Sequence, residues 1–281
     1  MSASARTVPS LRLGRLEEAT NIDDVVRNVD QIIDWSINAK SHLGYFAVVY
    51  KRITLAIHEA IADGQFDDGN RVARLDVAFA QRYFNALNAY FHPNEYPDLT
   101  LAWEVAFVGD QDGQAIILQH LMSAFTAHIT FDLGMACFTI APDSLDTLEN
   151  DFNRVNAVLC SQIPGIIDVL QRLSPELRWI RRLLPDELGV FNWMLVKLRQ
   201  GAWLFAIYMA LNPENVIQKR VNQAASTAAL GAWYLQPPAQ LRPFRALVSA
   251  VAKHESHDVV ANIRALEGIS NAPDKLDEAY L

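Results

Sequence analysis

The chain has little cysteine and no pattern that marks it for export. Only two of its 281 residues are cysteines, Cys137 and Cys160, and both lie among apolar neighbours. This argues against a disulfide framework and favours a reducing compartment, so we expect a cytoplasmic protein. The first twenty residues contain arginines but no continuous apolar stretch of the kind that a secretory signal needs.

Positive charge is also scarce. The chain has 24 Lys and Arg against 32 Asp and Glu, which gives a formal net charge of -8. Nucleic-acid binding depends on clustered basic residues that neutralise phosphates, so we expect no nucleic-acid partner. The most apolar long segment, 188–211, contains Lys197 and Arg199, which would be costly at the centre of a bilayer. We therefore expect no stable membrane insertion, and a helical segment broken near Gly201.

Strand alternation is almost absent, and so are several catalytic motifs. The chain has no GxSxG elbow, no Walker A loop and no GxGxxG after a strand. Helical periodicity dominates instead, and a composition of 51% hydrophobic and 20% charged residues can form a large core. We predict an all-α fold of about nine to eleven helices in a single domain at residues 21–270. A flexible tail at 1–20 and a frayed end at 271–281 complete this prediction.

Start and stop signals place the helices. Asn21, followed by two aspartates, predicts a helix N-cap. Gly64 predicts the end of the next helix, and His92-Pro93 the end of the third. A helix is expected over about 116–138, and the prolines and apolar periodicity predict further helices at about 142–159, 164–173, 176–184, 186–211, 214–230 and 239–267.

The stretch QHLMSAFTAHITFDLG, residues 119–134, places three ionisable groups in an apolar, helix-forming run. On a helix His128 and Asp132 lie one turn apart, and His120 lies two turns earlier at roughly 80° from His128 around the axis. All three can then line one wall of a pocket. Imidazole and carboxylate are ligands of zinc and of non-haem iron, so a metal site is one hypothesis. The alternative is an imidazole held by a carboxylate in a helical core, without chemistry.

Asp76 is the best candidate to join this helix from elsewhere in the chain. It lies in the segment ARLDVAFAQRYFNAL, among apolar neighbours. A carboxylate in that setting is costly unless it meets a cation, a donor or a metal. Asp76 is therefore either a member of the site or half of a buried ion pair with Arg71, Arg74 or Arg82.

Two histidine-containing segments carry weaker signals. His58 and Glu59 are adjacent on a predicted helix, so they point about 100° apart and at most one can face the pocket. The second histidine of the HExxH zinc-protease pattern is missing there. His254 and His257 have a spacing that can grip a metal, but charged neighbours predict a position facing solvent.

The chain also contains a series of blocks that is more specific than any single motif. In order these are GYFAVVYKRIT, GQFDDGNRVARLDVAFAQRYFNAL, a W-x-x-AF segment, LQHLMSAFTAHITFDLG and DFNRVN, followed later by GAWLFA. Their succession, over about residues 20 to 230, resembles a bacterial family of uncharacterised proteins, a domain of unknown function. The resemblance implies a single helical domain and brings no activity with it. The histidine block of that family is typically NAHINLDLG, so Thr126 and Thr130 replace usual asparagines, which implies altered specificity if those positions contact substrate.

A second similarity is local. The step from His128 to Asp132 looks like one element of the helical zinc-dependent phospholipase C and single-strand nuclease group, in which such a pair shares metal with an Asp and a His from elsewhere. Asp76 and His120 are candidates for those two positions. This chain lacks the N-terminal Trp ligand, the export signal and the further histidines of that group. The similarity therefore implies one metal rather than a three-zinc cluster.

We therefore expect a metal-dependent enzyme, a hydrolase or other Lewis-acid catalyst, with Asp76, His120, His128 and Asp132 around one divalent ion, zinc or iron. The partner would be a small, partly apolar substrate, and His58, Glu59 or His120 would serve in acid/base catalysis. A second hypothesis is a cofactor-free isomerase or cyclase of small-molecule metabolism that uses a His and Asp pair. A third is a helical binding protein without chemistry. The large apolar fraction is compatible with a homodimer.

Overall fold

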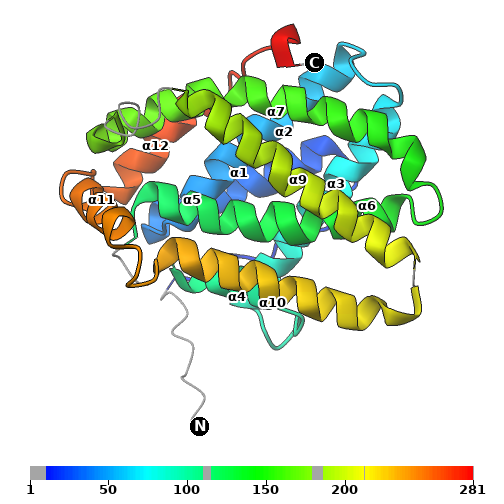
Figure 1. Ribbon diagram of the computed structural model, residues 1–281, viewed down its shortest axis with the longest axis horizontal. Coiled ribbons are helices and arrows are strands. Elements are labelled where there is room, and N and C mark those ends of the chain that lie inside the picture. The colour runs from blue at the N-terminus through cyan, green and yellow to red at the C-terminus, as the bar shows by residue number, and fades with distance from the viewer. Residues whose placement is uncertain (1–10, 110–114, 179–185, 212, 281) are drawn as a thin grey trace.

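Every regular element that the structure describes is a helix, so the predicted all-α single domain is confirmed (Figure 1). The computed structural model describes the chain except residues 1–10, 110–114, 179–185, 212 and 281. The elements, in order, are α1 Ile22–Ala39, α2 Leu43–Ala62, α3 Gly69–Phe91, α4 Leu101–Val108, α5 Ile117–Phe125, the π-helix η2 Thr126–Leu133, α6 Gly134–Ile140, α7 Leu145–Leu173, the 3-10 turn η3 Pro175–Leu177, α9 Glu187–Leu211, η4 Pro213–Asn215, α10 Val216–Leu235, α11 Arg242–Ala252, α12 Val259–Ser270 and η5 Glu278–Tyr280.

Local signals predicted the ends of the first three helices correctly. The side chain of Asn21 accepts a hydrogen bond from the backbone of Asp24 and caps α1. Helix α2 ends at Ala62, and Gly64 then adopts a φ of 69°, which favours glycine. Helix α3 ends at Phe91, next to His92-Pro93. In each case the stop or start depends on residues within one helical turn.

Three later predictions were wrong. Pro164 lies inside the continuous helix α7, whose turns pack against both α2 and α12. Helix α9 continues through Gly201, since a mid-helix glycine costs only about 1 kcal/mol relative to alanine. The segment 239–267 forms two helices, α11 and α12, instead of one. The predicted helix at 176–184 begins as the 3-10 turn η3, and its remainder reaches beyond the described residues.

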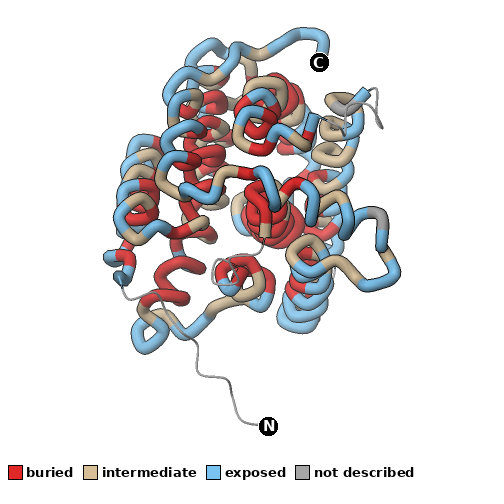
Figure 2. The backbone as a smooth tube through the Cα atoms, turned by 90° about the vertical axis from the view of Figure 1, so that its left-hand side faces the viewer, coloured by how far each residue is buried: buried red, intermediate tan, exposed pale blue. Residues whose placement is uncertain are grey.

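The segment made of α5, η2 and α6 is the central element of the fold. It contacts α2, α3, α4, α9 and α10, and buried residues gather on the inward sides of the surrounding helices (Figure 2). Close packing holds α9 against it, because a Cβ at Gly134 would come within 2.7 Å of the Ala202 carbonyl oxygen. Residues 117–140 are long and apolar enough to cross a membrane, but 78% of the apolar window is buried inside the protein. This is the pattern of a core helix.

Both ends of the domain differ from the prediction of loose tails. Leu13 and Leu16 are buried, and the Leu16 backbone exchanges hydrogen bonds with the side chain of Asn88 on α3. At the other end, the Arg52 guanidinium on α2 donates to the Ala272 carbonyl oxygen and pairs with Asp274. Residues 11–20 and 271–280 thus contribute to the packed domain.

Candidate functional site: a histidine and aspartate pair beside an apolar cavity

The central segment forms a π-helix over Thr126–Leu133, the stretch that contains His128 and Asp132. A π-helix is rare and often marks a functional site. Its hydrogen bonds span five residues instead of four, so residues four apart lie nearly in line. His128 and Asp132 face one another accordingly, with 3.2 Å between His128 Nδ1 and Asp132 Oδ2.

Two further donors hold the Asp132 carboxylate. Trp103 Nε1 on α4 donates to Oδ2 over 2.7 Å, and Arg82 Nε on α3 donates to Oδ1 over 3.0 Å. Asp132 is 1% exposed, so this charge is compensated inside the protein rather than by water. The carboxylate is therefore fixed, and it fixes the orientation of the histidine in turn.

His128 is held as a neutral base. Its ring stacks on Phe79 with 3.6 Å between centroids and meets Tyr50 edge-on. Burial lowers the pKa of His128, against the opposing effect of Asp132. Neutral imidazole donates through Nδ1 to Asp132, which leaves the lone pair on Nε2. Nε2 is buried and has no hydrogen-bond partner among the described residues.

His128 forms part of the wall of an apolar cavity of about 140 Å³. The cavity lies between α2, α3, α5, η2, α7 and α9, and its lining is aliphatic and aromatic apart from Tyr50, His128 and Arg199. A concave apolar space with a few convergent polar groups is the usual form of a small-molecule site. His128 thus lines the cavity while its buried Nε2 has no hydrogen-bond partner among the described residues.

Asp76 is buried but lies apart from the pair. It is 5% exposed, its Oδ2 has no hydrogen-bond partner among the described residues, and burial raises its pKa to about 7. The predicted ion pairs do not form with two of the three arginines, because Arg71 binds Asp151 and Arg82 binds Asp132. Asp76 does act electrostatically on Tyr50, whose pKa it raises together with burial. It thus neighbours the cavity through Tyr50 without lining it.

His120 does not share a wall with His128. It stacks on His42 with 4.6 Å between ring centroids and contributes to a separate cavity of about 20 Å³ that also contains Trp103. His120 lies on α5 and His128 on the π-helix η2, and the two side chains have different neighbours. The structure therefore corrects the prediction of a single wall made by His120, His128 and Asp132.

The weaker candidates lie on the surface. His58 and Glu59 are both exposed on α2 and do not line the main cavity, so neither reaches His128. The buried side of α2 is taken by Ile57 and Ala60. His254 is exposed as predicted, and it forms an ion pair with Glu176 in the connection between α11 and α12.

The two threonines of the histidine block face backbone and α10. Thr126 Oγ1 donates to the Met122 carbonyl oxygen, and Thr130 Oγ1 donates to the Thr126 carbonyl oxygen. Thr130 also meets Thr227 Oγ1 at 3.0 Å. Neither threonine lines the main cavity, so their contacts do not support the predicted role in specificity.

The site suits a hydrogen-bonded pair better than the predicted metal centre. In the part of the chain that the structure describes, no three His, Cys, Asp or Glu side chains are grouped to hold an ion. Both oxygens of Asp132 already accept hydrogen bonds, and the nearby Arg82 cation opposes a second positive charge. Asp76, His120, His128 and Asp132 are not brought together as a ligand set. A bound divalent ion remains a prediction.

Sequence reasoning missed three contributors to the site. Tyr50 and Arg199 line the cavity, and Trp103 anchors Asp132. The signal that could have found Arg199 was an arginine in the most apolar stretch of the chain. The partners of Asp132 come from α3 and α4, 50 and 29 residues away, and no local pattern reports such contacts.

Fold and site together define an all-α domain with a His and Asp pair beside an apolar internal cavity. The family model described as "Family of unknown function (DUF5995)" matches residues 22–237, and the chain belongs to this family. The match spans α1 to α10 and so includes the whole pair and its partners. No curated protein and no solved structure is significantly similar to the chain.

Proposed function

We propose that the protein is a cofactor-free enzyme, an isomerase or cyclase type of catalyst, that moves a proton on a small and largely apolar substrate. The observation that carries this proposal is that His128 lines the cavity and that its buried Nε2 has no hydrogen-bond partner among the described residues. His128 would take a proton from the substrate and return it at another atom, so no further reactant is needed. Asp132 would hold the tautomer and stabilise the imidazolium that forms.

A generic proton-transfer substrate tests this proposal without knowledge of the natural one. We would use 5-nitrobenzisoxazole, an apolar compound whose ring opens to a coloured phenolate when a base removes its ring proton. His128→Ala should lower the rate by about 10²-fold or more, the usual contribution of a general base. His58→Ala on the exposed face of α2 is the matched control and should leave the rate unchanged.

The pH dependence gives a second readout on the same base. Only neutral His128 accepts a proton, so the rate should rise with pH and level off above the pKa of His128. Burial lowers that pKa from 6.5, so the midpoint should lie below 6.5. Equal rates for the protein and for His128→Ala, with both folded by circular dichroism, would disprove the proposal.

The metal-dependent hydrolase is the second candidate, supported by the pairing of His128 with Asp132. It corresponds to the local likeness to zinc-dependent phospholipase C. Metal analysis after expression in zinc- and iron-replete medium separates the two candidates. Stoichiometric metal that is lost in His128→Ala would favour the hydrolase, and full activity after chelation would favour the cofactor-free enzyme.

A homodimer is a further proposal, supported by exposed apolar side chains on neighbouring helices. On α9 these are Trp193, Leu204, Tyr208 and Leu211, and on α10 Ile217 and Val221. Exposed apolar groups in such number are a common feature of interfaces. Sedimentation velocity, with Leu204→Lys as the disrupting variant, measures the oligomeric state.

A further inference from the structure

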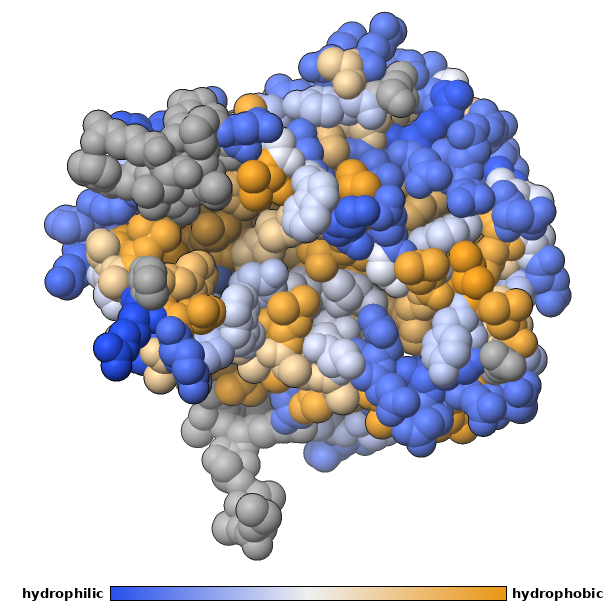
Figure 3. All heavy atoms as spheres, viewed as in Figure 1, coloured by the Kyte–Doolittle hydropathy of each residue, from blue (hydrophilic) through white to orange (hydrophobic). Residues whose placement is uncertain are grey.

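A second apolar cavity, of about 150 Å³, adjoins the one that His128 lines. The two cavities share four wall residues, Leu118 and Met122 from α5 and Phe191 and Met194 from α9. Methionine is unbranched and adapts its shape at low cost, so a partition built partly from Met122 and Met194 can yield to a ligand. We therefore treat the two cavities as the lobes of one apolar space, with volumes of about 140 and 150 Å³. Figure 3 shows a hollow with hydrophobic residues around it on the left half of the face where α9 lies in front.

Among the described residues that line the two lobes, the one cation is Arg199, in the first lobe. Arg199 is 3% exposed and lines that lobe. Its Nε donates to Asn156 Oδ1 over 2.5 Å, and its Nη2 donates to the Phe152 carbonyl oxygen over 2.9 Å. Both acceptors are neutral, and within the described residues no carboxylate forms an ion pair with Arg199. Burial lowers the pKa of this guanidinium to about 10.

A buried cation without an anion is unfavourable, and an anionic ligand would compensate it. Arginine suits a carboxylate because its planar guanidinium matches the two oxygens. The apolar remainder of both lobes suits a hydrocarbon. A ligand with a carboxylate at one end and a hydrocarbon chain beyond it, an aliphatic acid, therefore suits this space.

We propose that the cavity binds a long-chain aliphatic monocarboxylic acid, with its carboxylate at Arg199 and its chain passing Met122 and Met194 into the second lobe. This goes beyond the proposed function, because it names a ligand class for the cavity and does not depend on a reaction at His128. The acid places part of its chain beside His128 in the first lobe. Chain length and head group then determine affinity separately.

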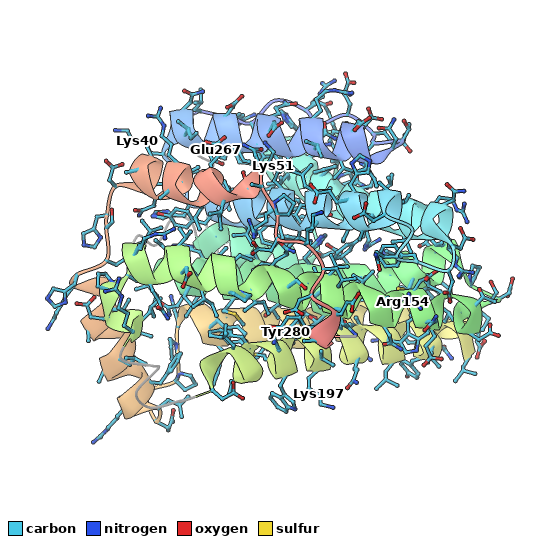
Figure 4. All side chains as sticks on the ribbon, turned by 90° about the horizontal axis from the view of Figure 1, so that it is seen from above. Lys40, Lys51, Arg154, Lys197, Glu267 and Tyr280 are labelled. Carbon is cyan, nitrogen blue, oxygen red and sulfur yellow. The ribbon has the colours of Figure 1, made fainter. Side chains whose placement is uncertain are left out.

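Binding of palmitate, octanoate and hexadecanol, each measured by displacement of the fluorescent acid cis-parinaric acid, tests the head group. Palmitate should bind at least about tenfold more tightly than hexadecanol, and Arg199→Met should remove this preference. Lys197→Met is the matched control, since Lys197 lies on the same helix and points away from it into solvent (Figure 4). Unchanged hexadecanol binding in Arg199→Met shows that the variant is folded. If Arg199→Met fails to fold, Arg199→Lys replaces it and should retain the preference for palmitate in reduced form.

Val248→Trp tests the second lobe, because Val248 lines that lobe alone. This substitution should lower the affinity for palmitate by about tenfold or more and leave the affinity for octanoate unchanged. Gln200→Trp, at an exposed position of α9 that lines neither lobe, should change neither affinity. Equal affinity for palmitate and hexadecanol, or for palmitate and octanoate, would overturn the proposal. His128→Ala should still bind palmitate, so loss of proton transfer with intact binding separates the two proposals.

Discussion

Two buried carboxylates, Asp132 in the π-helical segment and Asp76 in the middle of α3, have opposite surroundings. Asp132 accepts hydrogen bonds from Trp103 and Arg82 and faces His128. Asp76 has an oxygen without a partner among the described residues, and burial raises its pKa to about 7. The same side chain in the same core is therefore an anchored anion in one region and a group that holds its proton in the other. Burial alone does not determine the state of a carboxylate, since the donors from other helices decide it.

The largest expected effect on stability comes from removal of the Asp132 carboxylate. Asp132→Ala leaves the partly buried guanidinium of Arg82 and the buried N–H groups of Trp103 and His128 without their acceptor. Removal of one partner from a buried charged pair costs about 3–5 kcal/mol, and we expect that loss in the free energy of unfolding. Urea denaturation measures it. A loss below about 1 kcal/mol would mean that the Asp132 network contributes little.

The buried carboxyl group of Asp76 should make the stability of the protein depend on pH. Between about pH 4 and pH 7 the unfolded chain releases the Asp76 proton and the folded protein keeps it, so the folded state binds more protons and stability falls as pH rises. The shift from 3.8 to about 7 corresponds to up to about 4 kcal/mol. Asp76→Asn cannot ionise and should lack this loss. Between pH 4.5 and pH 8, the free energy of unfolding measured in urea should fall more for the wild type than for Asp76→Asn. An equal fall in both proteins would contradict a raised pKa of Asp76.

A smaller change sharpens the role of the donors. Trp103→Phe keeps an aromatic ring on α4 but removes the hydrogen bond to Asp132 Oδ2. A hydrogen bond to a charged group contributes about 1.5–3 kcal/mol, so the free energy of unfolding should fall by that amount. In a double-mutant cycle with Asp132→Asn the two losses should not add. Additive losses would show that the ring, and not its N–H group, accounts for the effect.

The smallest effect is expected outside both regions. His58 was a candidate catalyst by sequence, but its side chain is exposed on α2. His58→Ala should change the free energy of unfolding by less than about 0.5 kcal/mol and should leave proton transfer intact. Thermal denaturation and the benzisoxazole assay measure the two quantities. A large loss of stability or of proton-transfer rate would show that His58 contributes to the site after all.

Features that depend on a few neighbouring residues were predictable. The cap at Asn21, the stop at Gly64 and the one-turn step from His128 to Asp132 follow from local hydrogen bonding and helical spacing. The helix end predicted at Pro164 was wrong for a physical reason. Pro164 does not end its helix, because contacts of α7 with distant helices outweigh the local penalty.

The sequence by itself determined an all-α fold and a histidine and aspartate pair in a buried helix, because periodicity and spacing act within a few residues. Tertiary structure alone decided that His128 lines the cavity while His120 does not. It also decided that Arg82 and Trp103 hold Asp132, while Oδ2 of Asp76 has no donor among the described residues. It also decided that Arg199 is buried at the cavity wall. These outcomes depend on which helices meet, and that is set by packing between residues far apart in the chain.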